Sequence, residues 1–419
     1  MSNPRHYRHL QPLLDETWAE SPVVFLTGPR QSGKSTLVQA LAARQKIPYV
    51  TFDDYLALEE ATQRPEAFLE AHPAPIIFDE IQRVPQLFLG IKKRVDHARA
   101  GTRRASGMYL LTGSSSIESL PCLAEALVGR LRILHLHPLS AAEQSGKRAG
   151  FLDWAFGTAS SAPKTLSRGN TWEQAAHSAT FPEIALNKKL KRSSWFQGYV
   201  GGLLQRELRD IAEIDRPTSL PPLLQLLAAR SAQILNESSL ASSLGMPLAT
   251  LRRYRALLDA LHLSFTLPSW QRNLGKRLIH APKAYVADGA LQWHLLGRDP
   301  ASFKAGDPTQ LGMLAETFVT IELRRQVSLR PAERLFHFRT AMGKEVDLVV
   351  ERSDGRIIAI EVKAQPVLRS EDFSGLRELA ALAGKSLQRG IVLYLGKESR
   401  QISDRLWMAP IQTLWETPS

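Results

Sequence analysis

The chain has 419 residues, 44% of them hydrophobic and 22% charged, which is typical of folded globular proteins and unlike disordered chains. This length exceeds that of a typical single hydrophobic core, so we expect two or three domains. No stretch approaches the roughly 18 apolar residues that a membrane-spanning helix needs. The single cysteine excludes an internal disulfide and a cysteine-based zinc site. The first residues lack the apolar core of a signal peptide, so we expect a cytoplasmic protein without a membrane partner.

The net charge of +12 and the pI of about 9.8 favour a polyanionic partner such as DNA. Basic side chains near phosphates release condensed counterions, which drives such association. Charge alone does not decide the question, because many basic proteins bind only a small anionic substrate.

The first third of the chain alternates short apolar runs with helical patterns, which predicts a parallel α/β sheet with helices on both faces. We expect a helix over 35–44 and strands over 23–27, 48–52, 76–78, 108–112 and 131–136. The composition then changes, and we divide the chain into segments 1–145, 146–180, 181–300 and 301–419. The second segment is predicted to be a linker or insertion because it is rich in Ser, Ala, Gly and Lys.

The strand at 23–27 leads into the pattern G-x-x-x-x-G-K-[ST], which is followed by a helix. The pattern consists of Gly28, Pro29, Arg30, Gln31, Ser32, Gly33, Lys34, Ser35 and Thr36. Its glycines let successive backbone N–H groups face phosphates, to which the helix dipole adds positive potential. Lys34 would reach the β- and γ-phosphates and the Ser35 hydroxyl would ligate Mg²⁺. The motif predicts a P-loop that binds ATP with Mg²⁺.

An apolar strand ends in Asp79 and Glu80 about forty residues later, and we expect it to neighbour the P-loop strand. Asp79 can hold the magnesium shell, while Glu80 can orient or deprotonate the attacking water. The second acid favours ATP hydrolysis over nucleotide sensing. The strand at 108–112 ends in a serine-rich segment, where Ser114 or Ser115 could contact the γ-phosphate or the water; the alternative is a plain turn.

The order of these motifs, with Leu127-Val-Gly-Arg130 and Pro138-Leu-Ser140 after them, resembles one branch of the AAA+ ATPases. Members of that branch carry a C-terminal domain of unknown function. The resemblance implies that Ser114 or Ser115 is at the sensor position. It also implies a homo-oligomer in which Arg130 completes the site of a neighbouring subunit; a surface ion pair of Arg130 is equally compatible. Lys283, Asp288 and Gly289 match a segment typical of the family, without an evident role.

Residues 235–258 predict a helix, a glycine-containing turn and a second helix. Leu251, Tyr254 and Leu258 would share the buried face of the second helix. Arg252, Arg253 and Arg255 would then face outward and contact DNA. Strands over 263–267 and 284–287 would make this a winged helix. Such modules in AAA+ proteins also serve as packing or partner modules, and the alternative stays open.

The C-terminal segment predicts an α/β domain with a helix that carries Glu316 and a hairpin over 345–363. The hairpin carries Asp347, Glu361 and Lys363, and three carboxylates around one point could hold magnesium. This arrangement resembles the PD-(D/E)XK nuclease core, although Val346 stands where that motif has proline.

We therefore expect an oligomeric AAA+ ATPase that acts on DNA as a motor or switch. The alternatives are an ATP-regulated protein-interaction module with an inactive nuclease-like scaffold, and a nuclease whose ATPase controls access.

Overall fold

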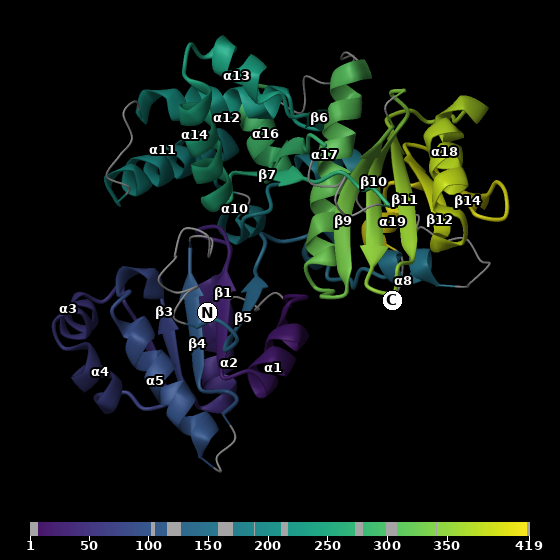
Figure 1. Ribbon diagram of the computed structural model, residues 1–419. Coiled ribbons are helices and arrows are strands. Elements are labelled where there is room, and N and C mark those ends of the chain that lie inside the picture. Colours follow the sequence, from purple (N-terminus) through teal and green to yellow (C-terminus); the bar gives the residue numbers. More distant parts are fainter. Residues whose placement is uncertain are drawn as a thin grey trace. The chain divides into compact units, whose positions relative to one another are not determined.

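The computed structural model describes residues 7–101, 105–114, 127–157, 171–187, 189–210, 217–272, 280–298, 308–340 and 342–416. The chain forms two compact units, shown in Figure 1. Unit 1 comprises Met1–Leu139 with Ala260–His262, and unit 2 comprises Ser140–Asp259 with Leu263–Ser419. The division of the chain into four segments stays a prediction.

Unit 1 contains a parallel sheet of five strands in the order β2-β3-β4-β1-β5. Every strand predicted for this region is present. The bounds are β1 Val23–Thr27, β2 Tyr49–Thr51, β3 Ile76–Asp79, β4 Tyr109–Gly113 and β5 Leu131–His135. One expectation was wrong: β3, which ends in the acidic pair, does not neighbour β1, because β4 lies between them.

The residues of β1, β3 and β4 are buried without alternation, because helices cover both faces of this sheet. Phe25, Phe78 and Leu111 pack on one face against the apolar sides of α4 and α5. The helical elements are α1 Gln11–Glu20, α2 Lys34–Gln45, α3 Tyr55–Gln63, α4 Pro65–Ala71, η1 Ile81–Arg83 and α5 Leu87–Ala100. The predicted helix after the glycine-rich loop is α2.

The first part of unit 2 is mainly helical. Its helices are α7 Ala141–Gln144, α8 Phe151–Phe156, α9 Trp172–His177, α10 Pro182–Leu186, α11 Arg192–Asp210, η3 Pro217–Ser219, α12 Leu220–Ala229, α13 Glu237–Ser243, α14 Leu248–Ala260 and α16 Gly289–Leu295. Its strands β6 Gln233–Ile234, β7 Ser264–Leu267 and β8 Lys283–Val286 form an antiparallel sheet in the order β6-β8-β7.

The predicted helix–turn–helix corresponds to α13 and α14. Asn236 caps α13 by accepting a hydrogen bond from the Ser239 N–H at 2.9 Å. The turn contains Gly245 with φ +60°, a left-handed conformation that favours glycine. Leu251, Tyr254 and Leu258 are fully buried on one face of α14, as the sequence predicted.

The second part of unit 2 contains a mixed sheet in the order β13-β14-β12-β11-β10-β9. The strands are β9 Glu333–Arg339, β10 Glu345–Arg352, β11 Ile357–Lys363, β12 Leu387–Tyr394, β13 Arg400–Gln401 and β14 Leu406–Pro410. The helical elements are α17 Pro308–Val327, η5 Ser370–Phe373, α18 Ser374–Ala383, η6 Gly384–Ser386 and α19 Thr413–Glu416. The predicted hairpin is confirmed as antiparallel β10 and β11.

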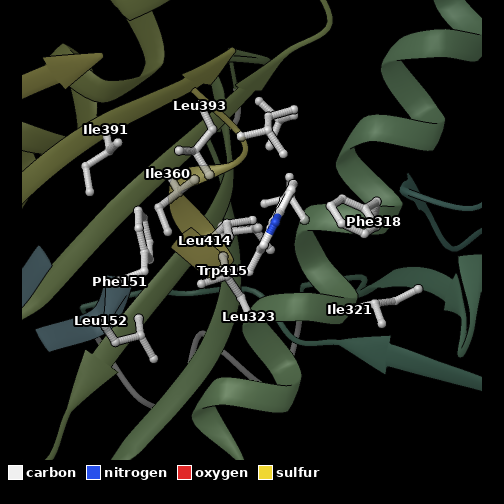
Figure 2. Close-up of a cluster of buried hydrophobic side chains, with 14 of the residues drawn as sticks. Phe151, Leu152, Phe318, Ile321, Leu323, Ile360, Ile391, Leu393, Leu414 and Trp415 are labelled. Carbon is white, nitrogen blue, oxygen red and sulfur yellow. The ribbon is translucent and has the colours of Figure 1, made fainter. Parts of the chain in front are cut away.

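Alternation along these strands divides the core of unit 2 between two faces of the sheet. Ile360 and Leu393 point toward Phe318 of α17 and Trp415 of α19, as Figure 2 shows. The opposite face packs against Leu376 and Leu379 of α18. Phe151, Leu152 and other residues of α8 belong to the first cluster, so part of the segment predicted as a linker or insertion is core.

Among the described residues, the structure contains no helix that combines the length and hydropathy needed to span a bilayer.

Candidate functional site

The glycine-rich loop of unit 1 joins the end of β1 to the start of α2. Gly28 has φ +153°, and a Cβ there would lie only 2.3 Å from the Leu136 carbonyl oxygen. Gly33 adopts a left-handed conformation, with φ +95°, immediately before α2. Both positions therefore require glycine. The Ser32 hydroxyl is buried and has no hydrogen-bond partner among the described residues, so the loop contains an unused polar group.

Lys34 is only 4% exposed, and its ammonium group is held by the loop itself. Its Nζ donates to the Gly28 oxygen at 2.9 Å and to the Pro29 oxygen at 3.0 Å. Burial lowers the pKa of Lys34 to about 8, against the opposing effect of the nearby Glu80 and Asp79 carboxylates. No described carboxylate forms an ion pair with it. This cation therefore has capacity for an anionic ligand.

Asp79 is 3% exposed at the end of β3, and side chains of two flanking strands hold its carboxylate. Tyr49 of β2 donates its hydroxyl to Oδ2 at 2.6 Å. Thr112 of β4 donates its hydroxyl to Oδ1. Burial, followed by the hydrogen bond to Asp79, raises the pKa of Tyr49, so Tyr49 stays a donor. The carboxylate is thus fixed at the edge of the sheet where the loop begins.

Glu80 follows Asp79 in a left-handed conformation, with φ +58° and ψ +44°. A non-glycine residue in this region costs on the order of 1 kcal/mol, and such strain often marks functional positions. The Thr112 hydroxyl accepts the Glu80 N–H at 3.1 Å. The Glu80 carboxylate accepts hydrogen bonds from the Gln82 amide and from the Ser114 hydroxyl, the latter at 3.2 Å. The Gln82 amide also donates to Ser114 at 3.3 Å.

Sequence reasoning missed three residues of this site, namely Tyr49, Thr112 and Gln82. Gln82 lies two residues after Glu80, which is the one local signal that could have indicated it. Ser114, which was predicted, does contact the acidic pair, and Ser115 lies outside the described residues. Arg30 and Ser35 are half-buried, whereas Gln31 and Thr36 are exposed.

Arg130 lies away from the glycine-rich loop of its own chain. It precedes β5, and its successor Leu131 pairs with Val23 at the start of β1, whereas the loop follows the end of β1. Its Nε donates to Asp96 of α5 at 2.5 Å. The ion pair that was the alternative is therefore present, and a role in a neighbouring subunit stays a prediction.

The three arginines of α14 differ in their surroundings. Glu237 of α13 binds both Arg252, at 2.7 Å, and Arg255, at 3.2 Å. Arg255 also contacts Asp259 at 2.8 Å and is half-buried, which differs from the outward position that we expected. Arg253 is exposed beside the Tyr254 ring. Acidic partners thus offset part of the charge that would favour DNA.

The residues predicted in unit 2 form a second group of acids and lysines. Glu316 of α17 and Asp347 of β10 both contact the ammonium group of Lys283, a residue of β8. Glu361 and Lys363 of β11 form a separate ion pair at 2.8 Å. A register shift in β10 between Val346 and Val349 lets Asp347 accept the Val362 N–H at 2.8 Å.

Burial and the Asp347 charge raise the pKa of Glu316 and of Glu361 to about 8 each. Burial alone would lower the pKa of Lys283, but Glu316 and Asp347 outweigh it and raise that pKa. Within the described ranges, no three or more His, Cys, Asp or Glu residues are arranged to hold a metal ion. The arrangement of the described residues thus gives no support to the predicted magnesium site at these carboxylates, and that site stays a prediction.

Asp288, for which the sequence indicated no role, caps α16 by accepting the Leu291 N–H at 2.8 Å. Its other oxygen accepts a hydrogen bond from Thr180 and lies 3.8 Å from Arg325. Arg325 binds Glu322 at 2.6 Å. Asp288 thus belongs to a buried network that joins α16 to α17.

Three families match successive parts of the chain. Residues 20–145 match the family described as an AAA domain. Residues 170–302 and 311–414 match two domains of unknown function, DUF8612 and DUF4143. The AAA+ resemblance of the N-terminal part is confirmed, as is the presence of a C-terminal domain of unknown function.

Similar solved structures include a Walker-type ATPase of Pyrococcus abyssi, 14% identical with a TM-score of 0.41, covering 69% of this chain and 95% of that one. A RuvB mutant of Thermotoga maritima is 17% identical with a TM-score of 0.27, covering 64% of this chain and 91% of that one.

Two curated relatives are the uncharacterized proteins Mb2031c of Mycobacterium bovis and Rv2008c of Mycobacterium tuberculosis. Each is 30% identical over 402 residues, which cover 95% of this chain and 82% of the relative. The chain belongs to the same family as these two mycobacterial proteins, and its N-terminal part is an AAA ATPase-like domain.

Proposed function

We propose that unit 1 binds ATP with Mg²⁺ and hydrolyses it. The observation that carries this proposal is the buried ammonium of Lys34, which binds two backbone carbonyls and has no carboxylate partner among the described residues. An unneutralised buried cation is costly, and a phosphate would supply the missing negative charge. The close approach of Gly28 to Leu136 and the unpartnered Ser32 hydroxyl fit the same ligand.

The residues present fit a magnesium ion bound with the nucleotide. Ser35 at the start of α2 and Asp79 at the end of β3 supply a hydroxyl and a carboxylate, the oxygen ligands that magnesium prefers. Such an ion neutralises phosphate charge when it is bound. Tyr49 and Thr112 keep the Asp79 carboxylate in one orientation for this role.

Glu80 would orient the attacking water and take up its proton. Gln82 and Ser114 support this assignment because both donate hydrogen bonds to Oε2 of the Glu80 carboxylate. A positioned base is more effective than a mobile one, since each reaction then starts with its groups aligned. We assign Gln82 and Ser114 to positioning Glu80, and Ser114 also to the sensor position predicted from the sequence.

We further propose that the ATPase works as a homo-oligomeric switch in which Arg130 acts on a neighbouring site. This requires Arg130 to exchange its ion pair with Asp96 for the neighbour's phosphate. Association with DNA stays a prediction that the net charge of +12 and the exposed Arg253 support. The contacts of Glu237 with Arg252 and Arg255 favour the alternative, in which α14 is a packing or partner module.

The test is ATP turnover by the wild-type chain and by Glu80→Gln, each with and without linear, single-stranded or branched DNA. We expect Glu80→Gln to lose at least about 100-fold in turnover while it still binds nucleotide, because only the base is removed. The matched control is Glu60→Gln, an exposed position of α3, which should leave turnover unchanged. Unchanged turnover in Glu80→Gln would contradict the proposal. Stimulation of the wild type by DNA would favour a DNA-acting switch over a protein-interaction module.

A further inference from the structure

The carboxylates of unit 2 surround a lysine that comes from outside the nuclease-like motif. Lys283 lies on β8, 33 residues before Glu316 of α17 and 64 residues before Asp347 of β10. Its Nζ lies 2.7 Å from Glu316 Oε1 and 3.3 Å from Asp347 Oδ1. Its side chain is only 2% exposed, so the ammonium is enclosed among these elements.

The carboxylates of Glu316 and Asp347 also accept hydrogen bonds from other groups of the protein. Glu316 Oε1 also accepts from the Tyr285 hydroxyl at 2.8 Å. Asp347 Oδ2 accepts the Val362 N–H at 2.8 Å, so each Asp347 oxygen has a donor. A magnesium ion would need such oxygens at about 2.0–2.1 Å. The ammonium group contacts the oxygens that the metal would need, so the two cations exclude each other.

The charges of the whole cluster also leave little need for a metal ion. Three carboxylates, from Glu316, Asp347 and Glu361, face the two ammonium groups of Lys283 and Lys363. One proton would neutralise the remaining charge, and Glu361 has a place for it, since its buried Oε2 has no hydrogen-bond partner in the part of the chain that the structure describes. A divalent ion added to the intact cluster would leave a net positive charge in a buried site.

We propose that Lys283 is a built-in cation that takes the place of the metal ion in the nuclease-like site of unit 2. The cluster is then an internal ion-pair site that joins β8, α17, β10 and β11. It binds no divalent cation and supports no metal-dependent cleavage of phosphodiesters. The proposal goes beyond ATP hydrolysis, because it concerns another unit and holds whether or not unit 1 turns over ATP.

The test is Mn²⁺ binding to the nucleotide-free full chain, measured by electron paramagnetic resonance together with the thermal unfolding midpoint. The wild type should bind no Mn²⁺ in this cluster at millimolar concentration, and its unfolding midpoint should not respond to the metal. Lys283→Met keeps an unbranched side chain, one atom shorter, but removes the cation. It should gain an Mn²⁺ site and unfold about 5 °C higher with saturating Mn²⁺ than without it.

Lys283→Met leaves buried carboxylates without their partner, so it could fail to fold in the absence of metal. The double variant Lys283→Met with Glu316→Gln removes one of these charges, and we expect it to fold without metal and to bind Mn²⁺ more weakly than the single variant. Asp347→Asn added to Lys283→Met should abolish the new site. Comparing these variants shows whether the Mn²⁺ is bound by the carboxylates of this cluster.

Two results would overturn the proposal. One is Mn²⁺ binding by the nucleotide-free wild type that Asp347→Asn or Glu361→Gln removes. The other is a folded double variant that gains no Mn²⁺ site, since Lys283 would then not be what excludes the metal.

Discussion

Each unit contains a buried lysine close to carboxylates, and the two lysines are bonded in opposite ways. Lys34 of unit 1 donates to two backbone carbonyls, and burial lowers its pKa to about 8. Lys283 of unit 2 donates to two carboxylates, and their charges raise its pKa. Among the described residues, no carboxylate forms an ion pair with the first cation, whereas two carboxylates bind the second.

We infer from this difference that charge balance, more than the types of residue present, distinguishes the proposed ligand site from an internal ion pair. A lysine with two acids is present in both places. In our proposal the charge of Lys34 serves a phosphate, whereas the charge of Lys283 is used within the protein. Four predictions test this comparison.

The largest effect should follow from removing the ammonium group of Lys34. Lys34→Ala should weaken ATP binding about 100-fold or more, because the phosphates lose charge-assisted hydrogen bonds. Equilibrium binding of a fluorescent ATP analogue with Mg²⁺ would measure this. Lys46→Ala, just after α2, is the control and should bind as the wild type does. An affinity within threefold of the wild type would contradict the role of Lys34.

Removing the ammonium group of Lys283 should instead lower the stability of unit 2. Lys283→Ala should lower the free energy of unfolding of unit 2 by about 3 kcal/mol, because Glu316 and Asp347 stay buried without their partner. Its ATP affinity should not change. Denaturant unfolding would measure the loss, with the exposed Lys385→Ala as the control. If the free energy of unfolding of Lys283→Ala equalled that of the wild type, the ion pair would not stabilise unit 2.

The pH dependence of ATP binding should reflect Lys34. Its pKa is about 8 in the free protein, and the charged form is the one that binds phosphate. Bound phosphate raises that pKa, so binding above pH 8 requires proton uptake and the affinity falls as the pH rises. Between pH 7 and pH 9 we expect about a tenfold loss, set by the protonated fraction. Lys34→Ala should lack this pH dependence. An ATP affinity of the wild type that does not change between pH 7 and pH 9 would contradict the prediction.

The smallest effect should follow from removing one hydrogen bond to the Glu80 carboxylate. Gln82→Ala removes one of the two side chains that hold the Glu80 carboxylate. We expect about a fivefold loss in kcat with unchanged KM, which corresponds to one hydrogen bond. Gln82→Glu, which would repel Glu80, should lose more activity than Gln82→Ala. Equal changes in kcat and KM would indicate a general structural defect.

Local patterns were sufficient to predict the five strands of unit 1, the glycine-rich loop and the hairpin of unit 2. Each depends on residues that are neighbours in sequence, such as Gly28 and Gly33 around one turn. Tyr49 and Thr112 were not predictable in the same way. Their contact with Asp79 depends on the order of the strands, which places β2 and β4 on either side of β3.

The charge balance of unit 2 was not predictable from local patterns either. The sequence placed Asp347 and Glu316 in one predicted site, but the lysine that contacts both of them, Lys283, comes from β8 before α17. Similarly, the spacing of Arg252 and Arg255 indicated an exposed basic face, while Glu237 of the preceding helix neutralises part of it. Partners from distant elements decide the electrostatics in both cases.

One measurement tests the contrast between the two units most directly. Glu80→Gln protein, which should bind ATP without consuming it, is titrated with Mn²⁺ in the presence and absence of ATP, and bound Mn²⁺ is counted by electron paramagnetic resonance. We expect about one Mn²⁺ per chain with ATP and none without it. Tight Mn²⁺ binding without nucleotide that disappears in Asp347→Asn, or no Mn²⁺ binding with ATP, would contradict the assignment of the two sites.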